Sequence, residues 1–266
     1  MMMDARTIAA LALTLGLACP ADPGPGPFAV RPPEWLSGET ALYQVTRNDS
    51  VLYQIRVVLR LDEEIVQSPT GPRPAPTVLV TSTVRPVEVM AFFYDSSVAV
   101  FRRDSLLPLR SERHLETDLA SFLVEATYGP GRVRIRKQSI DGSEDTTLTL
   151  SGRVMDQDMI RTALRAVLPE PGSEFELAVV SPLDLRVREA RLKGLGTKLV
   201  AAPLDSVLCR EYEYDLGTRQ VRLWYEIAQP RRLVGFSDPV NGIKMLLVEY
   251  EPGGQEAVQV PVPGYR

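Results

Sequence analysis

Apolar and polar residues alternate along much of the chain. Between residues 51 and 61 the odd positions, from Val51 to Leu61, carry aliphatic or Tyr side chains, and the even positions include Gln54 and two arginines. A period of two places successive side chains on opposite faces of a strand. Residues 41–45 alternate in the same way, and Asn48-Asp49 between the two runs is typical of a tight turn. The pattern predicts a β-hairpin with one buried face.

Similar runs recur over the rest of the chain. We expect further strands at residues 77–84, 87–93, 98–102, 107–115, 122–128, 132–137, 146–150, 175–179, 185–192, 198–202, 207–214, 219–227, 233–236 and 244–250. Turn signals separate many of them, among them Gly129-Pro130-Gly131, Asp141-Gly142, Gly194–Gly196 and Asn241-Gly242. Short strands at this spacing predict an all-β fold with a mainly antiparallel meander. Because sheets twist, one of this size curls into a barrel or half-barrel.

One segment departs from the two-residue period and predicts a single amphipathic helix over residues 156–168. Its apolar positions follow helical spacing and are Met159, Ile160, Ala163, Leu164, Val167 and Leu168. Asp156 is the expected N-cap, and Pro169 and Pro171 end the helix. A helix against the concave side of the sheet would complete the core. The alternative is a lid over a ligand cavity.

The N-terminus predicts export. Residues 8–18 are uncharged and largely apolar, but the run ends after 11 residues, whereas a membrane-spanning helix needs roughly 20. It therefore has the features of a signal-peptide core. Leu15–Ala18 before Cys19 resembles the bacterial lipobox, in which the Cys becomes lipidated. A plain secretory signal cut near Ala18 or Ala21 is the alternative.

These features divide the chain into four parts. We expect a signal peptide over residues 1–19, a Pro- and Gly-rich tether over 20–34, a β-barrel-like domain over 35–252 and an irregular tail over 253–266. Alternating Pro and Gly favour an extended, semi-rigid spacer. Such a spacer would hold the domain away from a membrane surface.

Composition narrows the function classes. The chain is 44% hydrophobic and 24% charged, which fits a globular core, and its net charge of −4 argues against nucleic-acid binding. It has two cysteines. If Cys19 is lipidated or removed, Cys209 has no partner, so the domain depends on its core and not on a disulfide.

The sequence gives little support for a metal site or for a catalytic nucleophile. The single histidine, His114, would share a strand face with Glu112 and Glu116, but zinc sites usually collect three or four ligands from different elements. A solvated charged face is the expected arrangement. Cys209 lies on a predicted strand beside glutamates that would raise the pKa of its thiol, so we expect it to be inert. No cofactor, metal site or enzymatic activity is expected.

Paired carboxylates leave one enzymatic alternative open. Asp62-Glu63-Glu64, Glu144-Asp145 and Asp156 with Asp158 could supply the acid and base of a carbohydrate-active enzyme. All three groups stand at predicted strand ends or at the helix start, where acids also occur for turn and cap reasons.

Several short segments, in their order, resemble the bacterial domain of unknown function 3108 family. They are Gly38-Glu39-Thr-Ala-Leu-Tyr43, Asp104–Arg113 across Leu107-Pro108, the helix with Leu164–Gly172, Asp205–Tyr212, Val221–Tyr225 and Pro230-Arg231-Arg232. The resemblance covers about residues 35–250 and implies a secreted or envelope-located, strand-rich domain with one helix and no settled activity. This plan is also similar to the half-barrels that carry or receive lipoproteins at the bacterial outer membrane.

The apolar strand faces suggest a binding function. The candidate ligand-lining residues are Tyr43, Tyr53, Ile55, Val57, Phe175, Leu223 and Tyr225 of the strands, with Met159 and Ile160 of the helix. We expect a non-catalytic periplasmic lipoprotein, attached to the outer membrane through Cys19, that binds a lipid or other hydrophobic ligand. The alternatives are a scaffold in an envelope assembly, which needs an exposed apolar patch, and the carbohydrate-active enzyme. The sequence names no protein partner.

Overall fold

The computed structural model describes residues 33–68, 71–87, 93–167 and 169–254. The predicted signal peptide with Cys19, nearly all of the predicted tether and all but the first two residues of the predicted tail lie outside these ranges. Most of the strand predicted over residues 87–93 does so as well.

The described residues form a single sheet of fifteen strands. In chain order these are β1 (Thr40–Arg47), β2 (Ser50–Ser68), β3 (Gly71–Pro86), β4 (Phe93–Arg102), β5 (Pro108–Thr117), β6 (Ser121–Gly129), β7 (Arg132–Ser139), β8 (Gly142–Thr149), β9 (Val154–Asp156), β10 (Glu174–Ser181), β11 (Arg186–Ala201), β12 (Ser206–Asp215), β13 (Gln220–Glu226), β14 (Leu233–Asp238) and β15 (Ile243–Glu251). Their order across the sheet is β8-β7-β6-β5-β4-β3-β2-β1-β15-β14-β13-β12-β11-β10-β9. The ends of the described chain therefore meet in the middle of the sheet, where β1 pairs with β15.

The predicted hairpin is present as β1 and β2. Asn48 and Asp49 adopt φ values of 49° and 66°, the left-handed conformation that a two-residue hairpin turn requires. The buried face of β2 carries Ile55 and Leu59, in the register that the alternation predicts.

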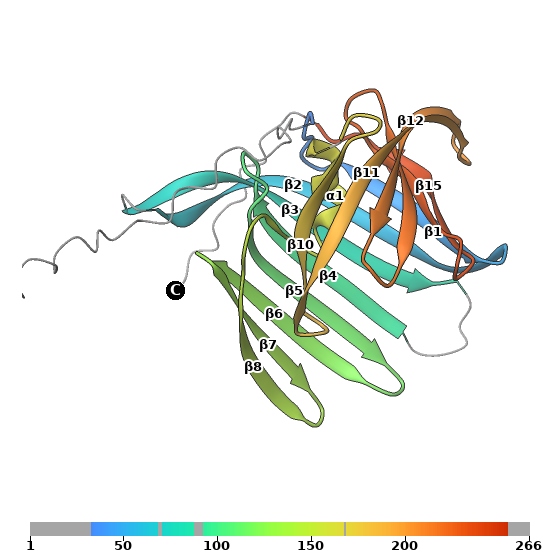
Figure 1. Cartoon of the computed structure of the whole chain (residues 1–266). Coiled ribbons are helices and arrows are strands. Elements are labelled where there is room, and N and C mark those ends of the chain that lie inside the picture. The colour runs from blue at the N-terminus through green and yellow to red at the C-terminus, as the bar shows by residue number, and fades with distance from the viewer. Residues whose placement is uncertain (1–32, 69–70, 88–92, 168, 255–266) are drawn as a thin grey trace, which may run out of the picture.

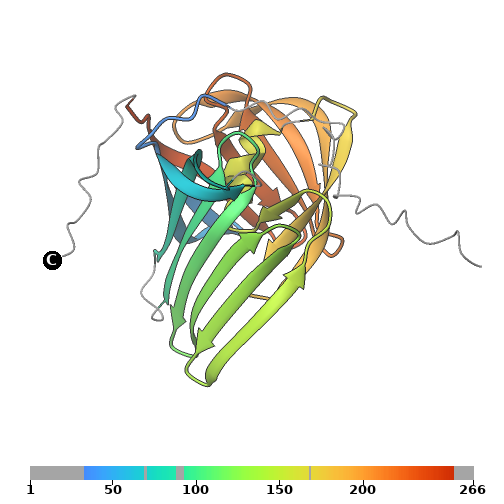
Figure 2. The same cartoon turned by 90° about the vertical axis from the view of Figure 1, so that its left-hand side faces the viewer.

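The sheet curls into a half-barrel and does not close, which confirms the predicted fold class (Figures 1 and 2). Its edge strands are β8 and β9. Instead of pairing with β8, the β9–β10 end packs its apolar side chains on β6 and β7, where Val154 and Val180 join Val133 and Ile135 in one buried cluster. The main core lies between the two walls of the half-barrel, β1–β4 on one side and β10–β15 on the other.

The helical segment lies inside the half-barrel, between those walls (Figure 1). It consists of α1 (Ile160–Ala163) and one 3₁₀ turn, η1 (Leu164–Ala166), and connects β9 to β10, the one parallel pair of the described sheet. Met159, Ala163 and Leu164 are almost completely buried, as core cover requires. Among the described residues no helix has the length and apolar character needed to cross a membrane.

The prediction for this helix was right in place and wrong in extent. Asp156 is the last residue of β9 and not the N-cap; Met159 occupies that position and makes no side-chain capping bond. The reason is that the carboxylate of Asp156 is engaged elsewhere, accepting hydrogen bonds from Ser111 and Tyr128 as well as from the backbone N–H of Asp158.

A second correction concerns Gly194–Gly196, which the sequence suggested as a turn between two strands. These glycines lie within one long strand, β11, at a register shift against β12. A Cβ at Gly194 would lie 2.5 Å from the carbonyl oxygen of Glu170, and Gly196 has a φ of 152°. The glycines therefore serve a β-bulge with close backbone packing and not a reversal of the chain.

Candidate functional site

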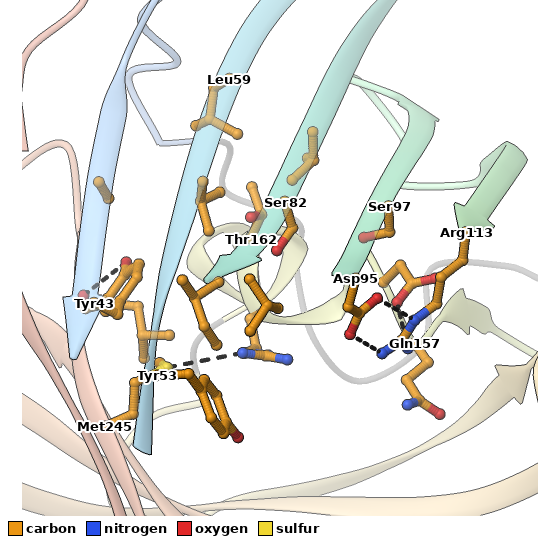
Figure 3. A pocket seen from close by; sticks show the side chains of 18 of the residues that line it. Tyr43, Tyr53, Leu59, Ser82, Asp95, Ser97, Arg113, Gln157, Thr162 and Met245 are labelled. Carbon is orange, nitrogen blue, oxygen red and sulfur yellow. Dashed lines mark hydrogen bonds and ion pairs between the residues drawn. The ribbon is translucent and has the colours of Figure 1, made fainter. Parts of the chain in front are cut away.

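A cavity of about 430 Å³ lies between the inner face of β1–β5 and the helical segment. Tyr43, Tyr53, Ile55 and Val57, four of the predicted lining residues, contribute to its apolar wall. Figure 3 shows Tyr43, Tyr53 and Leu59 on strands at one side of the cavity, with Asp95, Arg113 and Gln157 at the other. The volume is in the range of small-molecule sites.

A second cavity of about 350 Å³ lies on the other side of the helical segment, against β10–β14. Ile160 and Leu223, two more of the predicted residues, line it together with Val179, Tyr214, Leu216, Val221 and Phe236. Gln157 and Arg161 line both cavities, so the two adjoin at the start of the helical segment.

The other three predicted residues do not line these cavities. Met159, Phe175 and Tyr225 are buried in the main core. The hydroxyl of Tyr225 donates a hydrogen bond to the backbone oxygen of Arg161 at 2.7 Å, and burial raises the pKa of this phenol. Tyr225 thus positions the helical segment and does not face a ligand.

A buried ion pair fixes the end of the helical segment. Arg165 donates two hydrogen bonds to the carboxylate of Glu39, at 2.8 and 3.1 Å, and two more to the backbone oxygen of Pro230. Both charged side chains are only 4% exposed. The guanidinium also lies over the Trp35 ring. The segment is therefore tied to the residue before β1 and to the β13–β14 connection, which favours core cover over a movable lid.

The start of the segment is tied to β4 and β5. Arg113 donates to both carboxylate oxygens of Asp95, at 2.9 and 2.7 Å, and its third nitrogen lies 3.3 Å from Asp158. Burial raises the pKa of Asp158 to about 7, and the neighbouring charge of Asp156 acts in the same direction. Burial also raises the pKa of Asp156.

The remaining candidate groups stay apart. Cys209 is completely buried, and burial, followed by the charge of Glu226, raises the pKa of its thiol to about 12. His114 is 43% exposed, with Nε2 3.8 Å from Glu116. In the part of the chain that the structure describes, no three metal-ligating side chains gather at one point.

The carboxylate pairs also separate. Asp62 and Glu63 are exposed, and Glu64 binds Arg110 at 2.9 Å. Asp145 pairs with Arg134 on the exposed strand β8. Of all these acids, only Asp158 reaches a cavity wall.

Sequence reasoning missed the charged side chains of the site, above all Arg161, Arg165 and Arg113. A signal was present for the first two. They stand four residues apart on the polar side of the predicted helix. A polar helix face inside a half-barrel must find partners there. The partners themselves could not be found, because Glu39 lies 126 residues from Arg165 along the chain.

The fold defines a class, the β-barrel-like domains. The chain is similar to the crystal structure of a β-barrel-like protein of the domain of unknown function DUF1849 from Brucella abortus, at 13% identity, covering 85% of this chain and all of that one with a TM-score of 0.51. A second similar chain, described as an exported protein with a YmcC-like fold from Bacteroides fragilis NCTC 9343, aligns at 9% identity over 84% of this chain and 99% of its own, with a TM-score of 0.32. No protein-family model and no curated protein matches the chain.

The likeness to the first of these structures supports a β-barrel-like fold and adds no activity. No family model supports the resemblance to domain of unknown function 3108. The structure nonetheless brings three of its six segments together, since Glu39, the helical segment and Pro230 all meet at Arg165.

Proposed function

We propose that this protein binds a hydrophobic ligand, such as a lipid or an acylated molecule, without transforming it. The observation that carries the proposal is the pair of adjoining cavities, whose walls combine apolar side chains of the strands with charged and polar side chains. A fold that needed these strand faces only for stability would fill them with side chains at close packing. Concave sites that join apolar walls to fixed polar groups are typical of ligand-binding pockets.

The arrangement of the acids favours binding over catalysis. A glycosidase needs two carboxyl groups that both reach the substrate. Asp158 lines the first cavity, but Asp156 is fully buried and accepts hydrogen bonds from Ser111 and Tyr128. Asp95, which also lines the first cavity, accepts hydrogen bonds from Nε and Nη2 of Arg113 at its two carboxylate oxygens. A carbohydrate-active enzyme is accordingly the weakest of the three functions.

The proposal includes a location, the periplasmic face of the outer membrane with Cys19 as the lipidated residue. The lipobox-like residues before Cys19 and the Pro- and Gly-rich segment after it support this part. Replacing Cys19 with Ala should move the protein from the membrane fraction to the soluble fraction. An unchanged distribution between the membrane and soluble fractions would contradict lipid attachment at Cys19. It would not bear on ligand binding, which has its own test.

The test of ligand binding is native mass spectrometry on the purified protein, followed by solvent extraction and identification of bound material. A defined lipid should accompany the wild-type protein and be lost from Val57→Trp, whose indole would enter the first cavity. Val58→Trp is the matched control, because Val58 is the next residue of β2 and faces the other side of the sheet. Ligand-free protein in every preparation would contradict the proposal.

One observation favours the scaffold alternative. Three exposed aliphatic residues are neighbours at one end of β11–β13: Leu199 pairs with Leu208, and the backbone of Ile227 bonds to that of Leu208; exposed Leu204 lies in the β11–β12 connection. Chemical cross-linking in the envelope tests this alternative. An adduct that disappears with Leu208→Glu and persists with Ile65→Glu, a change at a more exposed site on β2, would favour it.

A further inference from the structure

Most charged side chains along the two cavities have a partner of opposite charge. In the first cavity Arg165 pairs with Glu39, Arg113 with Asp95 and Asp158, and Arg232 with Glu226. In the second, Arg188 pairs with Asp184, and Arg219 pairs with Asp238. These pairs leave each wall close to neutral.

Arg161 is the exception. Within the described ranges no carboxylate lies within salt-bridge distance of its guanidinium, whose polar contact is the sulfur of Met245 at 3.8 Å. A thioether is a weak acceptor, so most of the five N–H donors of this side chain are not used within the protein. Its backbone is nevertheless fixed, because its carbonyl oxygen accepts the hydrogen bond of Tyr225.

The position of Arg161 in the cavities also points to a role in binding a ligand. It lines both cavities, at the point where they adjoin, and apolar walls extend from it on either side. Four arginines and three acids line the first cavity, and three arginines and one acid line the second. The site therefore has a cationic side chain without an acidic partner between two chambers whose walls are partly apolar.

We propose that Arg161 binds the acidic group of an amphiphile whose apolar part occupies the chambers on either side, an inference that rests on the proposed function. A planar guanidinium binds carboxylate and phosphate oxygens through two parallel hydrogen bonds. Both acids fit the geometry, so the ligand class is an anionic amphiphile, a fatty acid or an anionic phospholipid. Arg161 then selects lipids with an acidic group, and the apolar side chains of the walls bury the apolar part of the ligand.

The test compares two probes that differ only in charge, cis-parinaric acid and its methyl ester, by fluorescence titration of the purified protein. The wild-type protein should bind the acid at least about tenfold more tightly than the ester, the effect of one charge-assisted hydrogen-bonded contact. Arg161→Gln should remove this preference by weakening the binding of the acid to that of the ester. Arg161→Lys should keep part of it, because a lysine retains the charge without the planar fork.

The matched control is Arg60→Gln, which makes the same change in net charge at an exposed position of β2 outside both cavities. It should behave as wild type. Two results would overturn the role of Arg161: equal affinity of the wild-type protein for acid and ester, or a preference for the acid that survives Arg161→Gln. In either case, binding of the ester would still support the proposed function. Failure of both probes to bind would overturn both.

The same comparison with phospholipids separates the two sources of acid. Native mass spectrometry with dioleoyl phosphatidic acid and dioleoylglycerol holds the chains constant and changes only the presence of the phosphate. A preference for phosphatidic acid that Arg161→Gln abolishes supports a phosphate ligand. A preference confined to parinaric acid supports a carboxylate ligand.

Discussion

Neutralising Glu39 should destabilise the protein strongly, because it would leave the Arg165 charge buried without a counter-charge. Each side chain of the pair is 4% exposed, and two hydrogen bonds of 2.8 and 3.1 Å join them. Removing one member of such a pair costs about 3–5 kcal/mol. Glu39→Gln keeps the shape and one acceptor oxygen, and Arg165 keeps the Pro230 carbonyl. We therefore expect the lower end, about 3 kcal/mol.

The double variant separates the pair energy from the loss of either residue. Arg165→Met alone should also destabilise, since it leaves the Glu39 carboxylate buried, but Glu39→Gln combined with Arg165→Met contains no buried charge. The double variant should lose less than the sum of the single variants by about 2 kcal/mol or more.

Urea unfolding followed by tryptophan fluorescence measures these differences, and Trp35, whose ring lies 5.2 Å from the guanidinium carbon of Arg165, reports on the site. Glu64→Gln is the control, because the Glu64–Arg110 pair has a similar 2.9 Å contact but is largely solvated. It should change stability by at most about 0.5 kcal/mol. A loss below about 1 kcal/mol for Glu39→Gln, or strict additivity in the double variant, would refute the reasoning.

Three further predictions concern single groups. The pKa of Asp158 is raised from 3.8 to about 7, so the folded protein keeps this proton at pH values where the unfolded chain has lost it, and stability falls as pH rises between those values. Asp158→Asn should flatten that decline when urea unfolding is compared at pH 5 and pH 8. An unchanged decline would contradict the prediction. Tyr225→Phe should cost about 1–2 kcal/mol in the same assay, since it leaves the Arg161 carbonyl without its donor, and a neutral effect would count against that role of Tyr225. Cys209 should resist a thiol reagent such as Ellman's reagent in the native protein and react once urea unfolds it, whereas rapid labelling of the native protein would show that the thiol is accessible.

The strands were predictable because alternation is a local signal. The β1–β2 hairpin follows from two alternating runs around Asn48-Asp49, whose left-handed turn needs only those two residues. The bulge at Gly194 and Gly196 was not predictable, because a glycine pair signals a turn equally well. The carbonyl of Glu170, which Gly194 approaches, comes from a different part of the chain.

The candidate site was predictable only in its apolar half. Tyr43, Tyr53, Ile55 and Val57 follow from strand periodicity, whereas Met159 was assigned to the ligand although it is buried in the core. Periodicity predicts which face of a strand or helix is apolar. It does not predict whether that face borders a cavity or packs against other side chains. Arg113 and Arg165 escaped notice because only the curled sheet brings them near their partners Asp95 and Glu39.

The most direct test of the account is a titration of the neutral probe, methyl parinarate, into wild-type protein and into the Val57→Trp and Val58→Trp variants. Both substitutions add the same ring at adjacent residues of β2, and only the first enters the cavity. The account predicts that wild type and Val58→Trp bind the probe and that Val57→Trp loses most of this binding. Equal binding by all three, or by none, would contradict a ligand site inside the half-barrel.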